Sequence, residues 1–187
     1  ETLDGHAYEI IFIDDGSTDG TFDCLRSRTD PQLRVIKFRR NFGQTAALDA
    51  GFKAARGRIV VPIDADLQND PADIPRLLEK LDEGFDVVSG WRRDRKDPLS
   101  KHLISRGANL LRKLLINDEI HDSGCTLKAY RRECLKGLDL YGEMHRFIPA
   151  LLQWRGFRIA ELPVTHHERR HGQTKYNIFR VLKGFLD

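Results

Sequence analysis

The sequence predicts an α/β fold built on a mostly parallel sheet with flanking helices. Short apolar runs alternate with segments of helix length as far as residue 89, and this alternation is typical of a parallel sheet wound right-handedly. Two of the runs, residues 8–13 and 58–63, end directly in aspartates. Ligands of open α/β sheets bind at the carboxyl ends of the strands, so these aspartates mark the expected functional edge.

Each element follows from its local pattern. Strands are expected at residues 8–13, 34–38, 58–63 and 85–89 because these runs are short and rich in Ile, Val and Phe. Helices are expected at residues 18–28, 44–55 and 72–83. The alternation then breaks, and later elements are expected near residues 101–117, 125–130, 144–154 and 157–162. Asp70 and Pro71 have the residue types favoured at the N-cap and first position of the third helix.

The composition indicates a soluble domain with a sizeable core. Hydrophobic residues make up 40% and charged residues 32% of the 187 residues, and no run approaches the roughly 18 apolar residues of a membrane span. Cys24, Cys125 and Cys134 lack C-x-x-C spacing, which argues for a reducing compartment without disulfides or a zinc site. The first residue is Glu and the last segment resembles an interrupted helix, so we interpret the chain as an excerpt of a longer protein.

The net charge of +3 conceals a separation of charge. Residues 92–113 carry +6, residues 166–187 carry +3 and the remainder carries −6. Basic segments of this kind suit a surface that faces phosphates of a nucleotide, a lipid headgroup or a nucleic acid. The alternative is a pair of ordinary solvated helix faces.

The segment DADLQNDP at residues 64–71 has the donors of a metal site. Asp64 and Asp66 follow an expected strand, and Gln68 adds a neutral oxygen. Such hard oxygen donors suit Mg²⁺ or Mn²⁺, which keeps positions open for a diphosphate. A solvated acidic turn before a helix is the alternative. The second acidic turn, at residues 14–21, favours the metal site because clustered carboxylates repel each other unless a cation or another ligand lies between them.

Two segments are amphipathic and basic. Residues 101–117 place leucines and Ile104 on one helical face and Lys or Arg on the other, and residues 177–187 repeat this pattern. The same pattern fits a helix packed on a core or a helix lying on a membrane surface. Two such helices in the basic half favour the membrane.

Eight motifs together resemble the polyprenyl-phosphate glycosyltransferases of glycosyltransferase family 2, which include dolichyl-phosphate mannose synthases and bacterial undecaprenyl-phosphate glucosyltransferases. The motifs, in chain order, are DDGSTDGT, NFGQTAALDAG, DADLQNDP, SGWR, ISRGANLL, DSGCTLKAYRRE, GEMHRF and HHERRHGQTKY. The resemblance covers nearly the whole chain. It implies a GT-A fold in residues 1–176, without the family's first strand and helix. It also implies that residues 177–187 begin a juxtamembrane helix that leads to a transmembrane region.

The resemblance implies an inverting enzyme that uses Mg²⁺ or Mn²⁺. Its donor would be a nucleotide-diphosphate sugar, either a UDP-hexose or GDP-mannose, with glucose as the first expectation and UDP-linked amino sugars as a further option. Its acceptor would be polyprenyl phosphate at the cytoplasmic face of a membrane, with the full protein anchored there as part of cell-envelope synthesis. A homo-oligomer is also expected.

Donor contacts are carried over by position. Ile13 and Asp15 would face the base and ribose, and Asp64, Ala65 and Asp66 would contact the nucleotide and the metal. Asp66 and Gln68 would be the most direct metal ligands.

Phosphate contacts follow in the same way. Arg92 and Arg106 would bind the donor diphosphate or the acceptor phosphate, because guanidinium groups hydrogen-bond phosphate oxygens in pairs. Arg169 and Lys175 would belong to a mobile acceptor loop. Asp122 would orient the acceptor or an arginine.

Other functions remain open at this point. A family 2 enzyme with a saccharide acceptor and a non-catalytic nucleotide-binding domain share most of these features. A receiver-like signalling domain would need a lysine at the end of the strand at 85–89, and none follows directly. Direct nucleic-acid binding at the acidic edge is disfavoured because phosphates would be repelled there.

Overall fold

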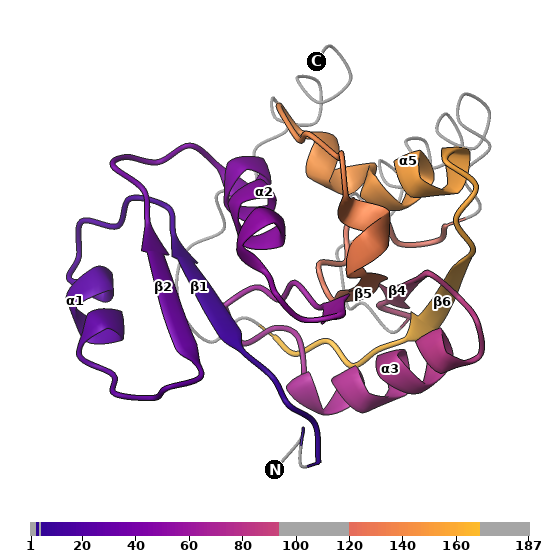
Figure 1. Cartoon of the computed structure of the whole chain (residues 1–187), viewed down its shortest axis with the longest axis horizontal. Coiled ribbons are helices and arrows are strands. Elements are labelled where there is room, and N and C mark those ends of the chain that lie inside the picture. Colours follow the sequence, from indigo (N-terminus) through magenta and orange to yellow (C-terminus); the bar gives the residue numbers. More distant parts are fainter. Residues whose placement is uncertain (1–2, 4, 94–119, 169–187) are drawn as a thin grey trace. The chain divides into compact units, whose positions relative to one another are not determined.

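The computed structural model describes residue 3, residues 5–93 and residues 120–168 of the chain (Figure 1). These residues form two compact units, which we describe one at a time. The first contains the described residues up to Val60 and the segment Arg131–Arg146. The second contains those of Val61–Tyr130 and Phe147–Gln173.

The first unit is built on two parallel strands, β1 (Ile10–Asp14) and β2 (Leu33–Lys37). They run side by side in Figure 1, with Ile10 opposite Leu33 and Asp14 opposite Lys37. Helix α1 (Thr21–Arg26) packs against β2, and helix α2 (Gln44–Ala54) packs against β1. The short strand β3 (Ile59–Val60) follows α2.

Two short 3₁₀ helices complete the first unit. The first, η2 (Arg132–Leu135), is held to the connection between α2 and β3, since the Arg132 backbone N–H donates to the Arg58 carbonyl at 2.8 Å. The second, η3 (Met144–Arg146), packs against α2. There the buried Thr45 hydroxyl lies 2.6 Å from the Gly142 carbonyl oxygen and 2.7 Å from Nδ1 of His145.

The second unit is built on strand β4 (Val87–Trp91), which lies between two others. Strand β5 (Lys128–Arg131) pairs with it antiparallel, and β6 (Ile159–Pro163) pairs with it parallel. Helix α3 (Ile74–Asp82) follows the 3₁₀ turn η1 (Pro71–Asp73), and helix α5 (Ile148–Trp154) precedes β6. This sheet is therefore mixed rather than purely parallel.

Part of the core of the second unit is formed by α3 and β4, which pack against each other. Leu77 and Leu81 of α3 and Val87 and Val88 of β4 have no exposed surface. The start of the helical segment is fixed as expected, because the Asp70 side chain accepts from the Ala72 backbone N–H at 2.9 Å and Pro71 occupies the first position.

Two local expectations about strands were wrong. The strand expected at 58–63 is confined to Ile59–Val60. The apolar run at residues 8–13 is typical of a buried strand, but Ile10 is 41% exposed and only Asp14 of β1 is buried. Among the described residues β1 has a single strand neighbour, β2, so it lacks the cover of a central strand.

The expected amphipathic segments, residues 101–117 and 177–187, lie outside the described residues. In the part of the chain that the structure describes, no helix is long and apolar enough to cross a bilayer.

We predict that Leu77→Ala lowers the free energy of unfolding by about 3 kcal/mol, because it leaves a cavity in a fully buried site. Glu79→Ala on the exposed face of the same helix should change it by no more than about 0.5 kcal/mol. Urea denaturation followed by circular dichroism measures both. Equal losses in the two variants would contradict the assignment of this helix face to the core.

Candidate functional site

The DADLQ turn has an unusual backbone at its centre. Leu67 has a φ of 62°, the only positive value at a non-glycine among the described residues, and its side chain is 59% exposed. This conformation is uncommon for a leucine, and such residues cluster at functional sites. On either side of Leu67, the Asp66 carboxylate accepts from the Gln68 backbone N–H at 3.1 Å. The turn thus holds Asp66 and Gln68 together.

Asp64 is oriented by two residues that are distant in sequence. The Thr126 hydroxyl donates to Oδ2 of Asp64 at 3.0 Å. The Asn69 side-chain amide in turn donates to the Thr126 hydroxyl at 2.9 Å, and Asn69 is buried. A carboxylate with one oxygen held in this way keeps a fixed direction, as outer-shell partners of metal ligands do.

The segment after β6 lies along the same turn. The His167 backbone N–H donates to the Gln68 carbonyl at 2.8 Å, and Asn69 and His166 form an isolated antiparallel bridge. The Gln68 side-chain nitrogen is 3.4 Å from Nε2 of His166. Hydrogen bonds from the Ala72 backbone and then from His167 lower the pKa of Asp70 below its usual value. Asp70 is therefore anionic at neutral pH beside the turn.

The donors at this turn fit a hard divalent cation. Among the described residues no group of three or more His, Cys, Asp or Glu side chains is arranged as a metal cage. Asp64, Asp66 and Gln68 instead offer two carboxylates and one amide. Mg²⁺ is usually held by one or two carboxylates and substrate phosphates rather than by a complete protein cage. The turn therefore fits a metal that is shared with a phosphorylated substrate.

Arg92 and Asp122, both predicted site residues, face each other. Nε of Arg92 lies 2.7 Å from Oδ2 of Asp122, and Nη2 lies 2.8 Å from Oδ1. Their side chains are only 12% and 11% exposed. The carboxylate thus accepts two hydrogen bonds from one edge of the guanidinium, and this bidentate contact fixes the plane of the guanidinium.

The backbone before Asp122 is anchored to β6. Glu161 accepts hydrogen bonds from the His121 backbone N–H at 3.0 Å, and the His121 ring lies 2.7 Å from the same carboxylate. The His121 ring also stacks on Trp91, with centroids 4.7 Å apart. These contacts fix the start of the loop that carries Asp122.

Ile13 and Asp15 belong to the first unit. The Asp15 carboxylate accepts from the Phe42 and Gly43 backbone N–H groups at 2.7 and 2.9 Å and from the Asn41 side chain at 2.8 Å. It therefore holds the loop that precedes α2. Ile13 lies next to Gly51 of α2.

The neighbouring Asp14 has one unsatisfied oxygen. Its Oδ1 accepts from the Ser17 backbone N–H at 2.9 Å, whereas the buried Oδ2 has no hydrogen-bond partner in the described part of the chain. A buried polar atom without a partner is costly, so Asp14 is a further candidate for a ligand contact.

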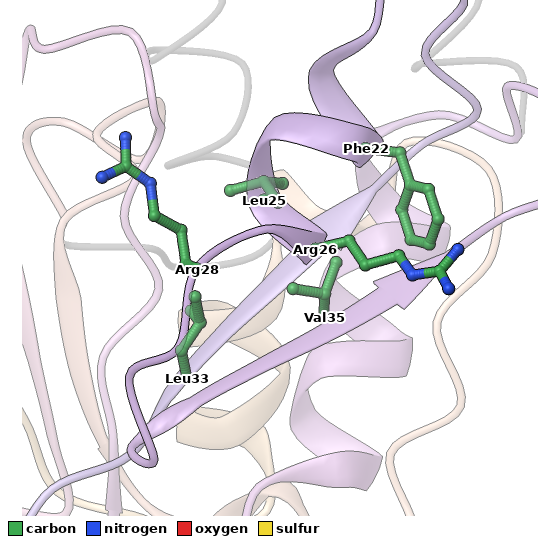
Figure 2. Close-up of a pocket in the computed structure, with 6 residues that line it drawn as sticks. All are labelled: Phe22, Leu25, Arg26, Arg28, Leu33 and Val35. Atoms are coloured by element: carbon green, nitrogen blue, oxygen red, sulfur yellow. The ribbon is translucent and has the colours of Figure 1, made fainter.

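The groove drawn in Figure 2 is a different feature. It has a volume of about 360 Å³ and is lined by Phe22, Leu25, Arg26, Arg28, Leu33 and Val35. It contains no carboxylate, histidine or predicted site residue. The candidate site is therefore defined by its polar network and not by this groove.

The remaining predicted residues divide into two groups. Ala65 lies exposed in the DADLQ turn. Arg106, Arg169 and Lys175 lie outside the described residues.

Sequence reasoning missed Asn69, Thr126 and Lys128. Thr126 and Lys128 stood in the DSGCTLKAYRRE motif, but no role was given to them. The available signal was Lys128 between the apolar residues Leu127 and Ala129 of an expected strand, because lysine is seldom fully buried.

The chain belongs to glycosyl transferase family 2, because the sequence profile of that family matches residues 3–138. Its relatives include a dodecaprenyl-phosphate galacturonate synthase of Rhizobium johnstonii, 46% identical over 97% of this chain and 56% of the relative. An undecaprenyl-phosphate 4-deoxy-4-formamido-L-arabinose transferase of Edwardsiella ictaluri is 40% identical over 98% of this chain and 57% of the relative. The chain thus spans about half the length of the curated relatives it matches.

Solved structures support the GT-A fold. A mannosyltransferase of Pyrobaculum calidifontis, in complex with GDP-mannose and Mn²⁺, matches with a TM-score of 0.65 at 23% identity over 95% of this chain and 54% of that one. Glucosyl-3-phosphoglycerate synthase of Mycobacterium tuberculosis, in complex with Mn²⁺ and UDP-glucose, matches with a TM-score of 0.63 at 22% identity over 87% and 60%. At such identities these matches establish the fold alone.

We predict that Asp122→Ala lowers the free energy of unfolding by about 3 kcal/mol, because it leaves the largely buried Arg92 without its carboxylate. Arg92→Met should also lose stability, and the double variant Arg92→Met, Asp122→Ala should lose much less than the sum of the two single losses. Glu83→Ala, which breaks an exposed pair with Lys80, should have little effect. Chemical denaturation of the four variants tests this. Additive losses would show that the two side chains contribute independently.

Proposed function

We propose that the protein transfers a sugar from a nucleotide-diphosphate donor to polyprenyl phosphate, with Mg²⁺ or Mn²⁺ at the DADLQ turn. The observation that carries this proposal is the 46% and 40% identity, over nearly the whole chain, to two relatives named as polyprenyl-phosphate sugar transferases. The network around Asp64 supports it, because a fixed carboxylate at a polar turn suits a metal that is shared with a diphosphate.

Asp64, Asp66 and Gln68 would hold the metal. When bound, the cation neutralises the charge that develops on the diphosphate leaving group, as a Lewis acid does. Thr126 and Asn69 would keep Asp64 aimed at it. Asp66 and Gln68, linked through the turn, would complete the protein's share of the ligands.

The acceptor needs little activation. A lipid phosphate is already anionic at neutral pH, so it can attack the anomeric carbon without a general base, with inversion at that carbon. Catalysis then depends on positioning and on the electrostatics of the phosphates. Arg92, with one guanidinium edge fixed by Asp122, would present positive charge to a phosphate. Arg106, Arg169 and Lys175 would supply more of it around the acceptor.

The sugar is inferred from the two relatives. Their names specify galacturonate and 4-deoxy-4-formamido-L-arabinose, so the expectation of glucose is corrected. We infer a donor that carries one of these two sugars, with UDP as the nucleotide. The basic segments at residues 92–113 and 166–187 would face the anionic lipid surface, at the cytoplasmic side of the membrane.

A donor screen tests the proposal. The full protein is incubated with undecaprenyl phosphate, Mn²⁺ and, separately, UDP-galacturonate, UDP-4-deoxy-4-formamido-L-arabinose, UDP-glucose and GDP-mannose, and lipid-linked products are identified by mass spectrometry. We expect product with one of the first two donors. Product from UDP-glucose or GDP-mannose alone would refute the sugar assignment, and no lipid-linked product at all would refute the proposed reaction.

We predict that Asp66→Asn abolishes the Mn²⁺-dependent part of UDP binding while the unfolding midpoint stays near that of the wild type. The variant keeps the side-chain volume but loses the negative charge that a hard cation requires. Isothermal titration of UDP with and without Mn²⁺ measures this, and Asp82→Asn at the end of α3 is the matched control. An unchanged Mn²⁺ effect would contradict the metal assignment.

We predict that Arg169→Ala and Lys175→Ala lower the rate of a single turnover at least about 10-fold while UDP affinity changes less than about 3-fold. An interaction formed mainly in the transition state lowers the rate constant without an equal loss of ground-state binding. Single-turnover transfer to polyprenyl phosphate, measured beside equilibrium binding, tests this. Normal turnover in both variants would place the acceptor site elsewhere.

A further inference from the structure

A buried lysine lies beside the candidate site. Lys128, the first residue of β5, is only 4% exposed. Fully buried lysines are rare because their amino groups need polar partners. Burial lowers the pKa of Lys128, and Cys125, Asp122 and Asp64 act against this effect. Its amino group therefore depends on polar partners inside the protein.

The partners of Lys128 belong to one short loop. Its Nζ donates to the Ser123 carbonyl at 3.2 Å and also to the Cys125 carbonyl. Both carbonyls lie in the segment Asp122–Thr126, which we call the DSGCT loop. The loop is tight, because the Cys125 backbone N–H donates to the Asp122 carbonyl at 3.2 Å. Lys128 thus connects the two carbonyls on either side of Gly124.

Each end of the DSGCT loop contacts one predicted site residue. At one end, Asp122 grips Arg92 through two hydrogen bonds. At the other end, Thr126 donates to Asp64. Between the two ends, Gly124 packs closely against the Arg92 guanidinium. A Cβ added at Gly124 would lie 3.3 Å from Nη2 of Arg92.

We propose that Lys128 is a positioning residue that fixes the DSGCT loop and, through it, sets the positions of Asp64 and Arg92 together. The inference rests on the proposed function, in which Asp64 serves the metal and Arg92 a phosphate. A loop held at the Ser123 and Cys125 carbonyls resists a shift of one end without the other. Lys128 would therefore fix the position of Asp64, which serves the metal, relative to Arg92, which serves the diphosphate. It would contact neither the metal nor the diphosphate.

A purely structural lysine would behave differently. Such a residue would contribute to stability, and its loss would affect the site only as much as any equal loss of stability elsewhere. Leu152 of α5 is fully buried in the same unit, and it takes part in none of the hydrogen bonds described above for the DSGCT loop. Leu152→Ala therefore serves as the control for stability alone.

The test compares Lys128→Met, Thr126→Val, their double variant and Leu152→Ala in the full protein. Mn²⁺-dependent affinity for UDP is measured by calorimetry at a temperature where every variant is folded. Amide hydrogen exchange of residues 120–127 and 74–82 is measured without ligand. Lys128→Met removes the amino group at similar length, and Thr126→Val cuts the bond to Asp64 without touching Lys128.

We expect Lys128→Met and Thr126→Val each to weaken Mn²⁺-dependent UDP binding about 10-fold or more, as loss of outer-shell partners does. The double variant should be no weaker than about the worse single variant, because both act through one loop. Exchange should rise at residues 120–127 in Lys128→Met but not at residues 74–82. Leu152→Ala should bind within about 2-fold of the wild type, since it leaves the hydrogen bonds of the loop intact.

Several outcomes would overturn the inference. The first is additive losses of UDP affinity in the double variant, and the second is wild-type hydrogen exchange of the loop in Lys128→Met. The third is wild-type UDP affinity in Thr126→Val. This third outcome overturns the inference even if Lys128→Met does not fold. If the wild-type protein itself shows no Mn²⁺-dependent UDP binding, the proposed function fails. The exchange of the loop then still shows whether Lys128 holds it.

Discussion

The hydrogen bond from the Thr126 hydroxyl to Asp64 is the contact on which the candidate site depends. It joins the DADLQ turn to the DSGCT loop, two segments separated by 62 positions in the sequence. Buried Asn69 supports the same hydroxyl. Because the loop also carries Asp122, which pairs with Arg92, one backbone segment connects the carboxylate proposed for the metal to the guanidinium proposed for a phosphate.

In the proposed reaction this arrangement would bring two positive charges to the diphosphate. A cation at Asp64 and Asp66 and the guanidinium of Arg92 would both act on phosphate oxygens, in a region where burial strengthens electrostatic interactions. The Asp122 carboxylate accepts hydrogen bonds from Nε and Nη2 on one edge of the Arg92 guanidinium and so orients the group. We therefore infer that the pair still presents positive charge to a phosphate.

Sequence patterns predicted the structure well where it depends on residues that are close together in the chain. The helix expected at 44–55 is Gln44–Ala54, and the capping role of Asp70 was correct. Burial of β1 was predicted wrongly, because it depends on which elements cover a strand. The contacts between Arg92 and Asp122 and between Lys128 and the DSGCT loop join side chains whose meeting depends on strand pairing and loop path. The sequence indicated the donor types of the site but not the network that positions them.

The most direct test of the account is a crystal structure of the protein with Mn²⁺ and UDP, with the metal located by its anomalous scattering. The account predicts one strong peak at about 2.1 Å from an oxygen of Asp66, with Asp64 and Gln68 beside it, Thr126 still bonded to Asp64, and diphosphate oxygens completing the coordination. A peak elsewhere in the molecule, or a diphosphate bound without any metal at the DADLQ turn, would contradict it.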